Sequence, residues 1–244
     1  MTAVLEKTKK SRASGARKPS AASNPDPIPP EKGHKRLLLV ASSKGGSGKT
    51  VSAINLAVNA THAGLRVATV DLDRQETLTR WIAVRPPEAP EIVHFKIPVD
   101  QIGVGMRDIE NAEDVDLFIV DTPPGIEDHP EAVRLLMQRA DFCLVPTGQG
   151  ISDLDSVIEW NRLLKREKVR SAFLLNRTKR NAKSFERAKI RLVKEGSLCP
   201  FDVRDLEDIT NLGVYGVGVL EIRGSRGFDD CEGVWTYVRG QLGI

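Results

Sequence analysis

Long hydrophobic runs are missing from this 244-residue sequence, since no apolar segment approaches the roughly 18–20 residues that span a bilayer. The N-terminus also lacks the apolar core of a secretory signal, so we expect a cytoplasmic protein. We also expect no membrane partner. Only three cysteines are present, at Cys143, Cys199 and Cys231, and none forms a CxxC pair. This spacing favours neither a disulfide framework nor a cysteine metal site, and we expect buried free thiols.

What the sequence does have is an uneven distribution of charge. The formal net charge is +3, but residues 1–36 carry nine Lys or Arg against three acidic residues, a net charge of +6. Residues 162–194 carry thirteen Lys or Arg against Glu167 and Glu186, a net charge of +11, which leaves −14 on the remainder. Positive charge concentrated in two segments favours an anionic polymer as a partner.

The chain divides into an N-terminal tail and one domain. Residues 1–34 are rich in Ser, Ala, Lys and Pro and lack a periodic apolar face, which predicts a disordered basic tail. In residues 35–244 we predict strands at 36–42, 66–71, 92–97, 115–121, 141–146 and 169–176, and a weaker one near 199–203. We predict helices at 49–63, 76–84, 100–111, 129–139, 152–167, 181–195, 205–212 and 228–241. This alternation predicts an α/β domain whose mostly parallel, doubly wound sheet has helices on both faces.

A glycine-rich loop at residues 43–50 separates the first predicted strand from the first predicted helix. Glycines let backbone N–H groups converge on an anion, and the helix N-terminus adds its dipole. Lys49 can then neutralise the β- and γ-phosphates of a nucleotide, while the Thr50 hydroxyl can ligate Mg²⁺. The residues that we expect to bind the nucleotide here are Gly45, Gly46, Ser47, Gly48, Lys49 and Thr50.

Lys44 is a second lysine at the start of this loop, and it indicates which class of phosphate-binding loop is present. The segment KGGSGKT, from Lys44 to Thr50, resembles the deviant Walker A motif of the ParA/MinD family of P-loop ATPases. In that family the leading lysine crosses a dimer interface and touches the ATP of the partner. The resemblance therefore implies a homodimer in the ATP-bound state, with Lys44 acting in the site of the other subunit.

Two further segments match the same family in the expected order. The segment 71–75, DLDRQ, resembles the DxDPQ segment of ParA proteins and includes the 24-residue step from Lys49 to Asp73. The resemblance implies that Asp73 orients the attacking water and that Asp71 lies near Thr50 and the Mg²⁺ shell. Arg74 stands where the family has proline, and aspartates are also common in surface turns.

The segment 117–125 is an apolar strand that ends in Asp121 and continues as Thr-Pro-Pro-Gly. It resembles a Walker B strand with the DTPP extension of the family, so Asp121 is expected to hold Mg²⁺ through a water. Asn176 aligns with an asparagine that contacts the adenine edge in the family. An asparagine at this place is equally typical of an ordinary turn.

Basic residues follow one another at helical spacing after residue 176. Steps of three or four residues would align them on one helix face, and Glu186 is the one acidic residue among them. A solvated helix face is the usual explanation, but phosphate-backbone binding without sequence readout fits the excess charge better. The residues that we expect to bind DNA are Arg180, Lys183, Arg187, Arg191 and Lys194.

Taken together, these motifs resemble those of a small ParA. The C-terminal segment 228–244 holds one arginine, so it does not resemble a basic membrane helix, and the tail is too short for a helix-turn-helix domain. The resemblance implies a nucleoid-associated ATPase that uses ATP and Mg²⁺, binds DNA non-specifically and positions a plasmid, chromosome origin or protein cluster. A cargo-bound, ParB-like protein would stimulate hydrolysis. Two alternatives stay open: a metabolic ligase that phosphorylates a small carboxylate, and a MinD-like ATPase at the membrane surface.

Overall fold

The computed structural model describes residues 35–244, so the predicted tail at 1–34 lies outside the described residues. Six parallel strands form one sheet in the order β3-β2-β4-β1-β5-β6. Their bounds are Arg36–Val40 (β1), Val67–Asp71 (β2), Val93–Lys96 (β3), Leu117–Asp121 (β4), Phe142–Thr147 (β5) and Ser171–Leu175 (β6). Parallel strands covered on both faces are apolar along most of their length, which is why these runs do not alternate with polar residues. The predicted fold class is confirmed.

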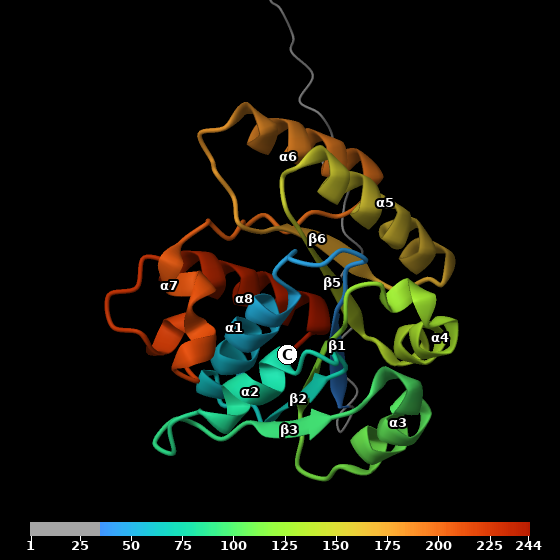
Figure 1. Ribbon diagram of the computed structural model, residues 1–244, viewed down its shortest axis with the longest axis vertical. Helices are drawn as coiled ribbons and strands as arrows, with labels where there is room; N and C mark the ends of the chain where they lie inside the picture. Colours follow the sequence, from blue (N-terminus) through green and yellow to red (C-terminus); the bar gives the residue numbers. More distant parts are fainter. Residues whose placement is uncertain (1–34) are drawn as a thin grey trace, which may run out of the picture.

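Two layers of helices enclose the sheet (Figure 1). One layer contains α1 (Lys49–His62), α2 (Thr77–Ala83), α7 (Glu207–Thr210) and α8 (Phe228–Leu242). The other contains α3 (Ile102–Asn111), α4 (Pro130–Arg139), α5 (Ile151–Arg166) and α6 (Lys183–Glu195). Short 3-10 turns lie at Val99–Gln101, Ile126–Asp128, Leu212–Val214 and Val219–Glu221. None of the helices within residues 35–244 has the length and apolar character that crossing a membrane requires.

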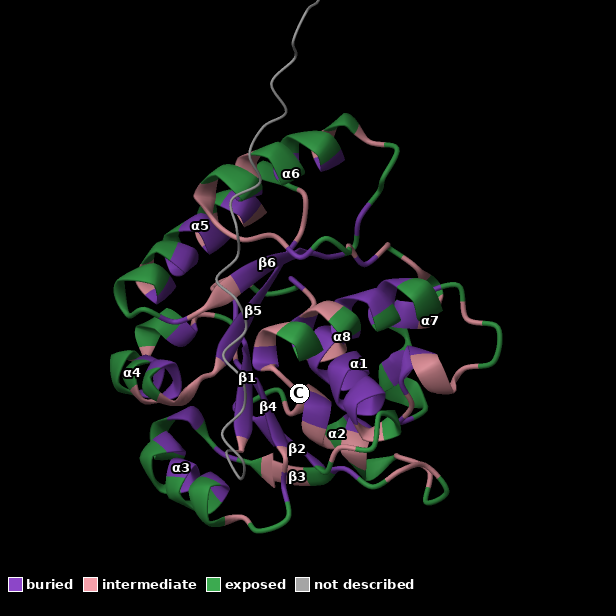
Figure 2. Ribbon diagram, turned by 180° about the vertical axis from the view of Figure 1, so that it is seen from behind, coloured by how far each residue is buried: buried purple, intermediate pink, exposed green. Residues whose placement is uncertain are grey.

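The side chains of the central strand β1 contribute to two hydrophobic cores, one on each face of the sheet. Leu37 and Leu39 pack into the core under α3 to α6, while Leu38 and Val40 pack into the core under α1, α2 and α8. Successive side chains of a strand point to opposite faces, so a run of five buried residues must meet apolar helices on both sides. Figure 2 shows the resulting buried strands between outer helix faces that are exposed.

Apart from 199–203, the predicted strands and helices are all present, and their ends differ from the structure by at most two residues. Residues 199–203 form no strand; the segment runs beside β6 with isolated bridges at Leu198 and Arg204. Pro200 lies between the bridges, and a residue without an N–H cannot donate to a continuous ladder. The predicted helix 181–195 begins two residues later, at Lys183.

The register of the sheet places polar residues together at its carboxyl edge. Val40 of β1 and Asp71 of β2 both pair with Asp121 of β4. Strands β2 and β4 therefore end at the same level, directly beside the loop that leaves β1. The sheet brings into one place three strand ends that are far apart in the sequence.

Candidate nucleotide-binding site

The loop between β1 and α1 has the backbone that its glycines predict. Gly46 has φ +74° and Gly48 has φ +88°, conformations that side-chain-bearing residues rarely adopt. A Cβ at Gly48 would also overlap the amide of Asn176. The first turn of α1 leaves its N–H groups without helical partners, so the loop forms an anion cradle in front of them.

Lys49 lies inside this cradle and is buried. Its Nζ donates to the carbonyl oxygens of Ser42 (3.2 Å) and Lys44 (3.0 Å). Burial lowers the pKa of Lys49, and the carboxylates of Asp121 and Asp73 oppose that change. The amine is thus held where a phosphate bound by the loop would meet it.

Asp121 is the most strongly perturbed carboxyl group of the site. Its Oδ2 accepts a hydrogen bond from Thr50 Oγ1 at 2.6 Å, whereas its buried Oδ1 has no hydrogen-bond partner among residues 35–244. Burial raises the pKa of Asp121 to about 7, and the neighbouring Asp71 adds to this effect. A buried carboxyl oxygen without a partner, next to a hydroxyl, is a donor set that fits a hard cation such as Mg²⁺.

The fit to Mg²⁺ depends on phosphate oxygens from the nucleotide. Within the described part of the chain, no group of three or more His, Cys, Asp or Glu side chains could hold a metal alone. Mg²⁺ commonly takes one or two protein oxygens together with substrate phosphates and waters. Thr50 and Asp121 have such oxygens beside the cradle, and their binding of Mg²⁺ stays a prediction.

Asp71 and Asp73 organise the loop that follows β2. Asp71 Oδ1 accepts the N–H of Asp73 (3.0 Å), and its Oδ2 accepts both the N–H (2.9 Å) and the hydroxyl (2.8 Å) of Thr79. Asp73 Oδ1 accepts the N–H of Gln75 at 2.9 Å, while its Oδ2 accepts no hydrogen bond from any described residue. Arg74, in the place of the family proline, is exposed, and the turn closes with Glu76 N–H on the Asp73 carbonyl at 2.9 Å.

A cavity of about 320 Å³ lies in front of the loop. Lys49, Thr50, Asp73, Pro124 and Thr210 are among the residues that line it. Pro124 precedes Gly125, whose N–H donates to the Ser43 carbonyl at 3.0 Å and so ties the Thr-Pro-Pro-Gly segment after β4 to the cradle. The cavity therefore joins the expected phosphate, metal and water groups.

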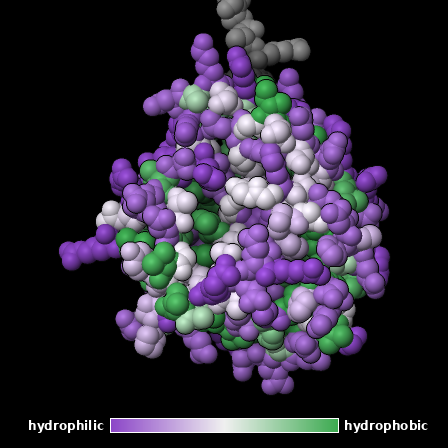
Figure 3. Space-filling view, viewed as in Figure 1, coloured by the Kyte–Doolittle hydropathy of each residue, from purple (hydrophilic) through white to green (hydrophobic). Residues whose placement is uncertain are grey.

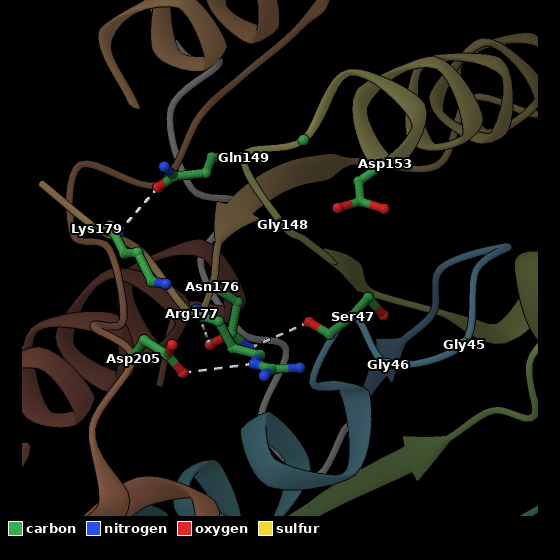
Figure 4. Close-up of a pocket in the computed structure, with 11 residues that line it drawn as sticks. Gly45, Gly46, Ser47, Gly148, Gln149, Asp153, Asn176, Arg177, Lys179 and Asp205 are labelled. Carbon is green, nitrogen blue, oxygen red and sulfur yellow. Dashed lines mark hydrogen bonds and ion pairs between the residues drawn. The ribbon is translucent and has the colours of Figure 1, made fainter. Parts of the chain in front are cut away.

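A second cavity, of about 330 Å³, continues from the loop toward β6 (Figure 4). Asn176 lies at its rim, where its Nδ2 donates to the carbonyls of Ser47 (3.3 Å) and Gly48 (3.4 Å). Asn176 thus fastens β6 to the loop, and its contact with adenine stays a prediction.

Gln149, Arg177, Lys179 and Asp205 also line this cavity, and none of them was predicted to bind the nucleotide. Arg177 Nε lies 3.5 Å from Asp205 Oδ1, and the Gln149 side chain accepts the N–H of Lys179 at 2.9 Å (Figure 4). These four residues line the cavity with the glycine loop. Gln149 and Arg177 are each the second residue after the end of a strand, β5 and β6 respectively. Position after a parallel strand is the signal that could have identified them.

Lys44 points away from the cradle toward the first turn of α5. Its Nζ donates to Ser152 Oγ at 2.9 Å and to Asp153 Oδ1 at 2.5 Å. The Lys44 and Asp153 side chains are 40% and 33% exposed, so solvent screens this ion pair. The predicted contact of Lys44 with the partner's nucleotide stays a prediction.

The basic helix face is smaller than the sequence predicts. Lys183, Arg187 and Lys194 are exposed on α6, opposite the buried Phe185 and Leu192. In Figure 3 the upper end of the molecule, where Figure 1 places α6, is covered mostly by hydrophilic residues.

The prediction for Arg180 as part of this face is wrong, because α6 begins only at Lys183. Arg180 Nε bonds Asp202 at 3.0 Å and its Nη2 bonds Asp230 at 3.2 Å. Arg191 lies on the helix, but it forms an ion pair with Asp155 of α5. Both guanidinium groups are therefore partly neutralised within the chain.

A family model described as the CobQ/CobB/MinD/ParA nucleotide binding domain matches residues 38–212. Maintenance of carboxysome distribution protein A from Gloeobacter kilaueensis is 32% identical over 130 residues, which are 53% of this chain and 57% of that protein. The protein of the same name from Halothiobacillus neapolitanus is 27% identical over 199 residues, 78% of this chain and 88% of its own length. The chromosome-partitioning ATPase Soj of Thermus thermophilus is 29% identical over 117 residues, 37% of this chain and 47% of its own. The chain thus spans about half the length of the Gloeobacter and Thermus proteins.

Solved structures show the same fold. The cell division ATPase MinD of Pyrococcus furiosus superposes with a TM-score of 0.70 at 18% identity, covering 84% of this chain and 99% of that one. The ATP complex of McdA from Cyanothece gives 0.66 at 20% identity, covering 86% and 97%. With the matched family model, the glycine loop and the sheet order, the chain belongs to the CobQ/CobB/MinD/ParA family of nucleotide-binding domains.

Proposed function

We propose that this protein is an ATPase that forms a homodimer when it holds ATP and Mg²⁺, binds DNA without sequence preference as the dimer, and releases the DNA after hydrolysis. It would work in the cytoplasm at the nucleoid and segregate or position a cargo. The observation that carries the proposal is the hydrogen bond from Thr50 to the buried Asp121, beside the cavity that Lys49 and Asp73 line.

Each group of the site has a distinct task in this reaction. The loop backbone and Lys49 would hold the β- and γ-phosphates, and Thr50 and Asp121 would hold Mg²⁺, which neutralises charge on the transferred phosphoryl group. The Asp73 oxygen that no described residue occupies can accept a hydrogen bond from the attacking water. Hydrolysis requires an oriented nucleophile and charge neutralisation, and these side chains supply both.

Dimerisation would require the Lys44 side chain to give up its contact with Asp153 of the same chain. An exposed ion pair contributes about 0–1 kcal/mol, so the contact with Asp153 is easily exchanged for a phosphate of the partner's ATP. We expect Lys44→Ala to bind ATP as a monomer but to form no ATP-dependent dimer. Size-exclusion chromatography with a slowly hydrolysed ATP analogue measures this, and an unchanged dimer peak would contradict the role of Lys44.

The DNA surface would centre on the outer face of α6. Lys183, Arg187 and Lys194 are exposed there and form no ion pair with any described residue. Phosphate contacts from such side chains fix no base sequence, and their strength falls steeply with salt. The segment 1–34, for which the sequence predicts a disordered basic tail, would add less to DNA binding, because ordering such a tail on DNA costs entropy.

The cargo and its activator complete the proposal. Relatives named for carboxysome distribution and for chromosome partitioning make a protein cluster and a chromosome origin both candidate cargos, together with a plasmid. A ParB-like protein bound to the cargo would accelerate hydrolysis and so release the dimer from DNA.

One observation favours a second candidate function at a membrane surface. Ile190 and Val193 of α6 are 58% and 62% exposed and lie among its lysines and arginines. Apolar side chains beside basic ones are also suited to an anionic lipid surface.

A direct comparison separates these functions. The full chain is incubated with ATP, ADP or a slowly hydrolysed analogue, and its binding to unrelated DNA duplexes and to vesicles containing phosphatidylserine is measured at about 0.15 M salt. We expect ATP-dependent binding to every duplex and none to vesicles. Binding to vesicles alone would establish the membrane function, and turnover only with an added small carboxylate would establish a ligase.

A further inference from the structure

A chain of polar side chains runs from the edge strand β3 to the loop that carries Asp73. Its central member is His94 of β3, a partly buried residue whose side chain contacts residues of both β2 and α2. His94 Nδ1 lies 3.0 Å from Thr69 Oγ1 of β2, and His94 Nε2 lies 3.0 Å from Thr79 Oγ1 of α2. Figure 1 shows α2 lying against the end of the sheet formed by β2 and β3.

The hydroxyl of Thr79 determines which ring nitrogen of His94 carries the proton. This hydroxyl has one proton, and at 2.8 Å it donates that proton to Asp71 Oδ2. It must then accept from His94, so Nε2 is protonated. Burial lowers the pKa of His94, which favours the neutral ring with a single N–H.

The other ring nitrogen is consequently an acceptor. His94 Nδ1 takes the hydroxyl proton of Thr69, whose alternative acceptor, the Val93 carbonyl, is more distant at 3.4 Å. Every proton in the chain then points the same way, from Thr69 through His94 and Thr79 to Asp71. Polar groups in such a one-directional chain polarise one another and favour one arrangement.

The chain ends at the loop of the hydrolytic site. Asp71 Oδ2 accepts the hydroxyl and the N–H of Thr79, and its Oδ1 accepts the N–H of Asp73. A second tether leaves the same edge strand, where Lys96 Nζ lies 2.6 Å from Glu76 Oε1 at the start of α2. The edge strand thus holds both α2 and the Asp71–Asp73 loop.

We propose that His94, in the neutral tautomer protonated at Nε2, is a positioning residue that sets the orientation of the Asp71–Asp73 loop for ATP hydrolysis. This inference rests on the proposed role of Asp73 in orienting water. Both hydrogen bonds of His94 go to residues outside the glycine loop, so we expect it to act on turnover and not on nucleotide binding. Partners behind a metal or catalytic group typically change affinity or activity by about 10–100-fold when removed.

The tautomer is tested on the full chain without nucleotide. Nitrogen-15 NMR of the imidazole rings distinguishes protonated from unprotonated ring nitrogens, and the signal lost in His94→Phe assigns His94 among the four histidines. We expect a protonated Nε2 and an unprotonated Nδ1. In Thr69→Val, Nδ1 loses the hydroxyl that donates to it, and a proton that then appears partly on Nδ1 supports the chain. A proton on Nδ1 in the parent overturns it.

The positioning role is tested by two substitutions with opposite expectations. Phe keeps an aromatic ring but makes neither hydrogen bond, while the Gln amide can donate to Thr79 as Nε2 does. With saturating ATP and Mg²⁺, we expect His94→Phe to lower the single-turnover hydrolysis rate about tenfold and His94→Gln to stay within about twofold of the parent. The Kd for ATP and the thermal midpoint are measured for each variant, and the Kd is expected to be unchanged.

Two results would overturn the inference: a parent-like rate in His94→Phe, or equal losses in Phe and Gln variants. Asp73→Ala is measured in parallel as the reference. If Asp73→Ala hydrolyses ATP as fast as the parent, the proposed function of Asp73 fails and His94 has no loop to orient. If Asp73→Ala is impaired but His94→Phe is not, the function of Asp73 stands and the inference about His94 alone fails.

Discussion

The phosphate end of the site and the outer face of α6 use charge in opposite ways. At the phosphate end, Lys49 and Asp121 are buried, and each is held by named partners. On α6, Lys183, Arg187 and Lys194 stand in solvent. Charges in a low-dielectric setting interact several times more strongly than charges in water. A single substitution at the phosphate end should therefore have a large effect on ATP binding or hydrolysis. Substitutions on α6 should weaken DNA binding only in part, by an amount that depends on salt.

The largest effect is expected for Lys49→Ala. Without its main cation, a triphosphate in the loop loses charge-assisted hydrogen bonds, and ATP affinity should fall at least about 100-fold. Titration with a fluorescent ATP analogue measures this, with Lys44→Ala as the matched control that keeps monomeric binding. Near-parental affinity in Lys49→Ala would show that the buried region does not depend on single charges.

Asp73→Ala should spare ATP binding and slow hydrolysis about 100-fold, because it removes the water-orienting oxygen and leaves the cradle intact. The ATP-bound dimer should then persist, which size-exclusion chromatography detects. A loss of ATP binding would mean instead that Asp73 supports the fold of the loop or holds the metal.

A smaller effect is expected on α6. Replacing Lys183, Arg187 and Lys194 with glutamate should weaken every DNA duplex alike, and each lost phosphate contact should lower the salt slope by about one unit. The matched control reverses three exposed arginines on other elements, namely Arg107, Arg134 and Arg223. Equal losses in both triple variants would show that only net charge matters, and the α6 surface would then have no special role.

The smallest effect concerns stability. The pKa of Asp121 is raised to about 7 in the folded chain from an ordinary 3.8, so the folded state keeps a proton that the unfolded state loses. The free energy of unfolding should accordingly fall as the pH rises from about 4 to about 7, by at most about 1.4 kcal/mol per pKa unit. Asp121→Asn has no such proton, and urea unfolding at several pH values should show a flatter dependence than the parent. Parallel curves would contradict the buried, unpartnered state of Asp121 Oδ1.

The same contrast explains how far the sequence could be interpreted. The glycine loop, Asp121 and the parallel α/β class follow from local patterns, because strand, loop and helix are adjacent in the chain and each residue type has a specific chemical requirement. The start of α6 could not be fixed within two residues from periodicity alone, and that error placed Arg180 on the wrong surface. Helix boundaries depend on tertiary contacts such as those of Arg180 with Asp202 and Asp230.

Residues that meet through topology were not predictable. His94, Thr79 and Asp71 come together because β3 lies beside β2 and α2 packs over both, and no motif marks a histidine in an edge strand. Gln149 and Asp205 reach the second cavity from loops more than fifty residues apart. Their roles depend on the order of strands in the sheet, which the sequence pattern did not specify.

The strand order has a consequence for folding during synthesis on the ribosome. A chain synthesised only through β2 already contains the glycine loop and Asp71, but Asp121 arrives with β4, which must insert between β1 and β2. Contacts between distant parts of a chain form late, so the cradle and its metal oxygens come together only when the centre of the sheet is complete. Nucleotide binding should therefore report on finished folding, and saturating ATP should stabilise the central sheet by RT ln(1 + [ATP]/Kd).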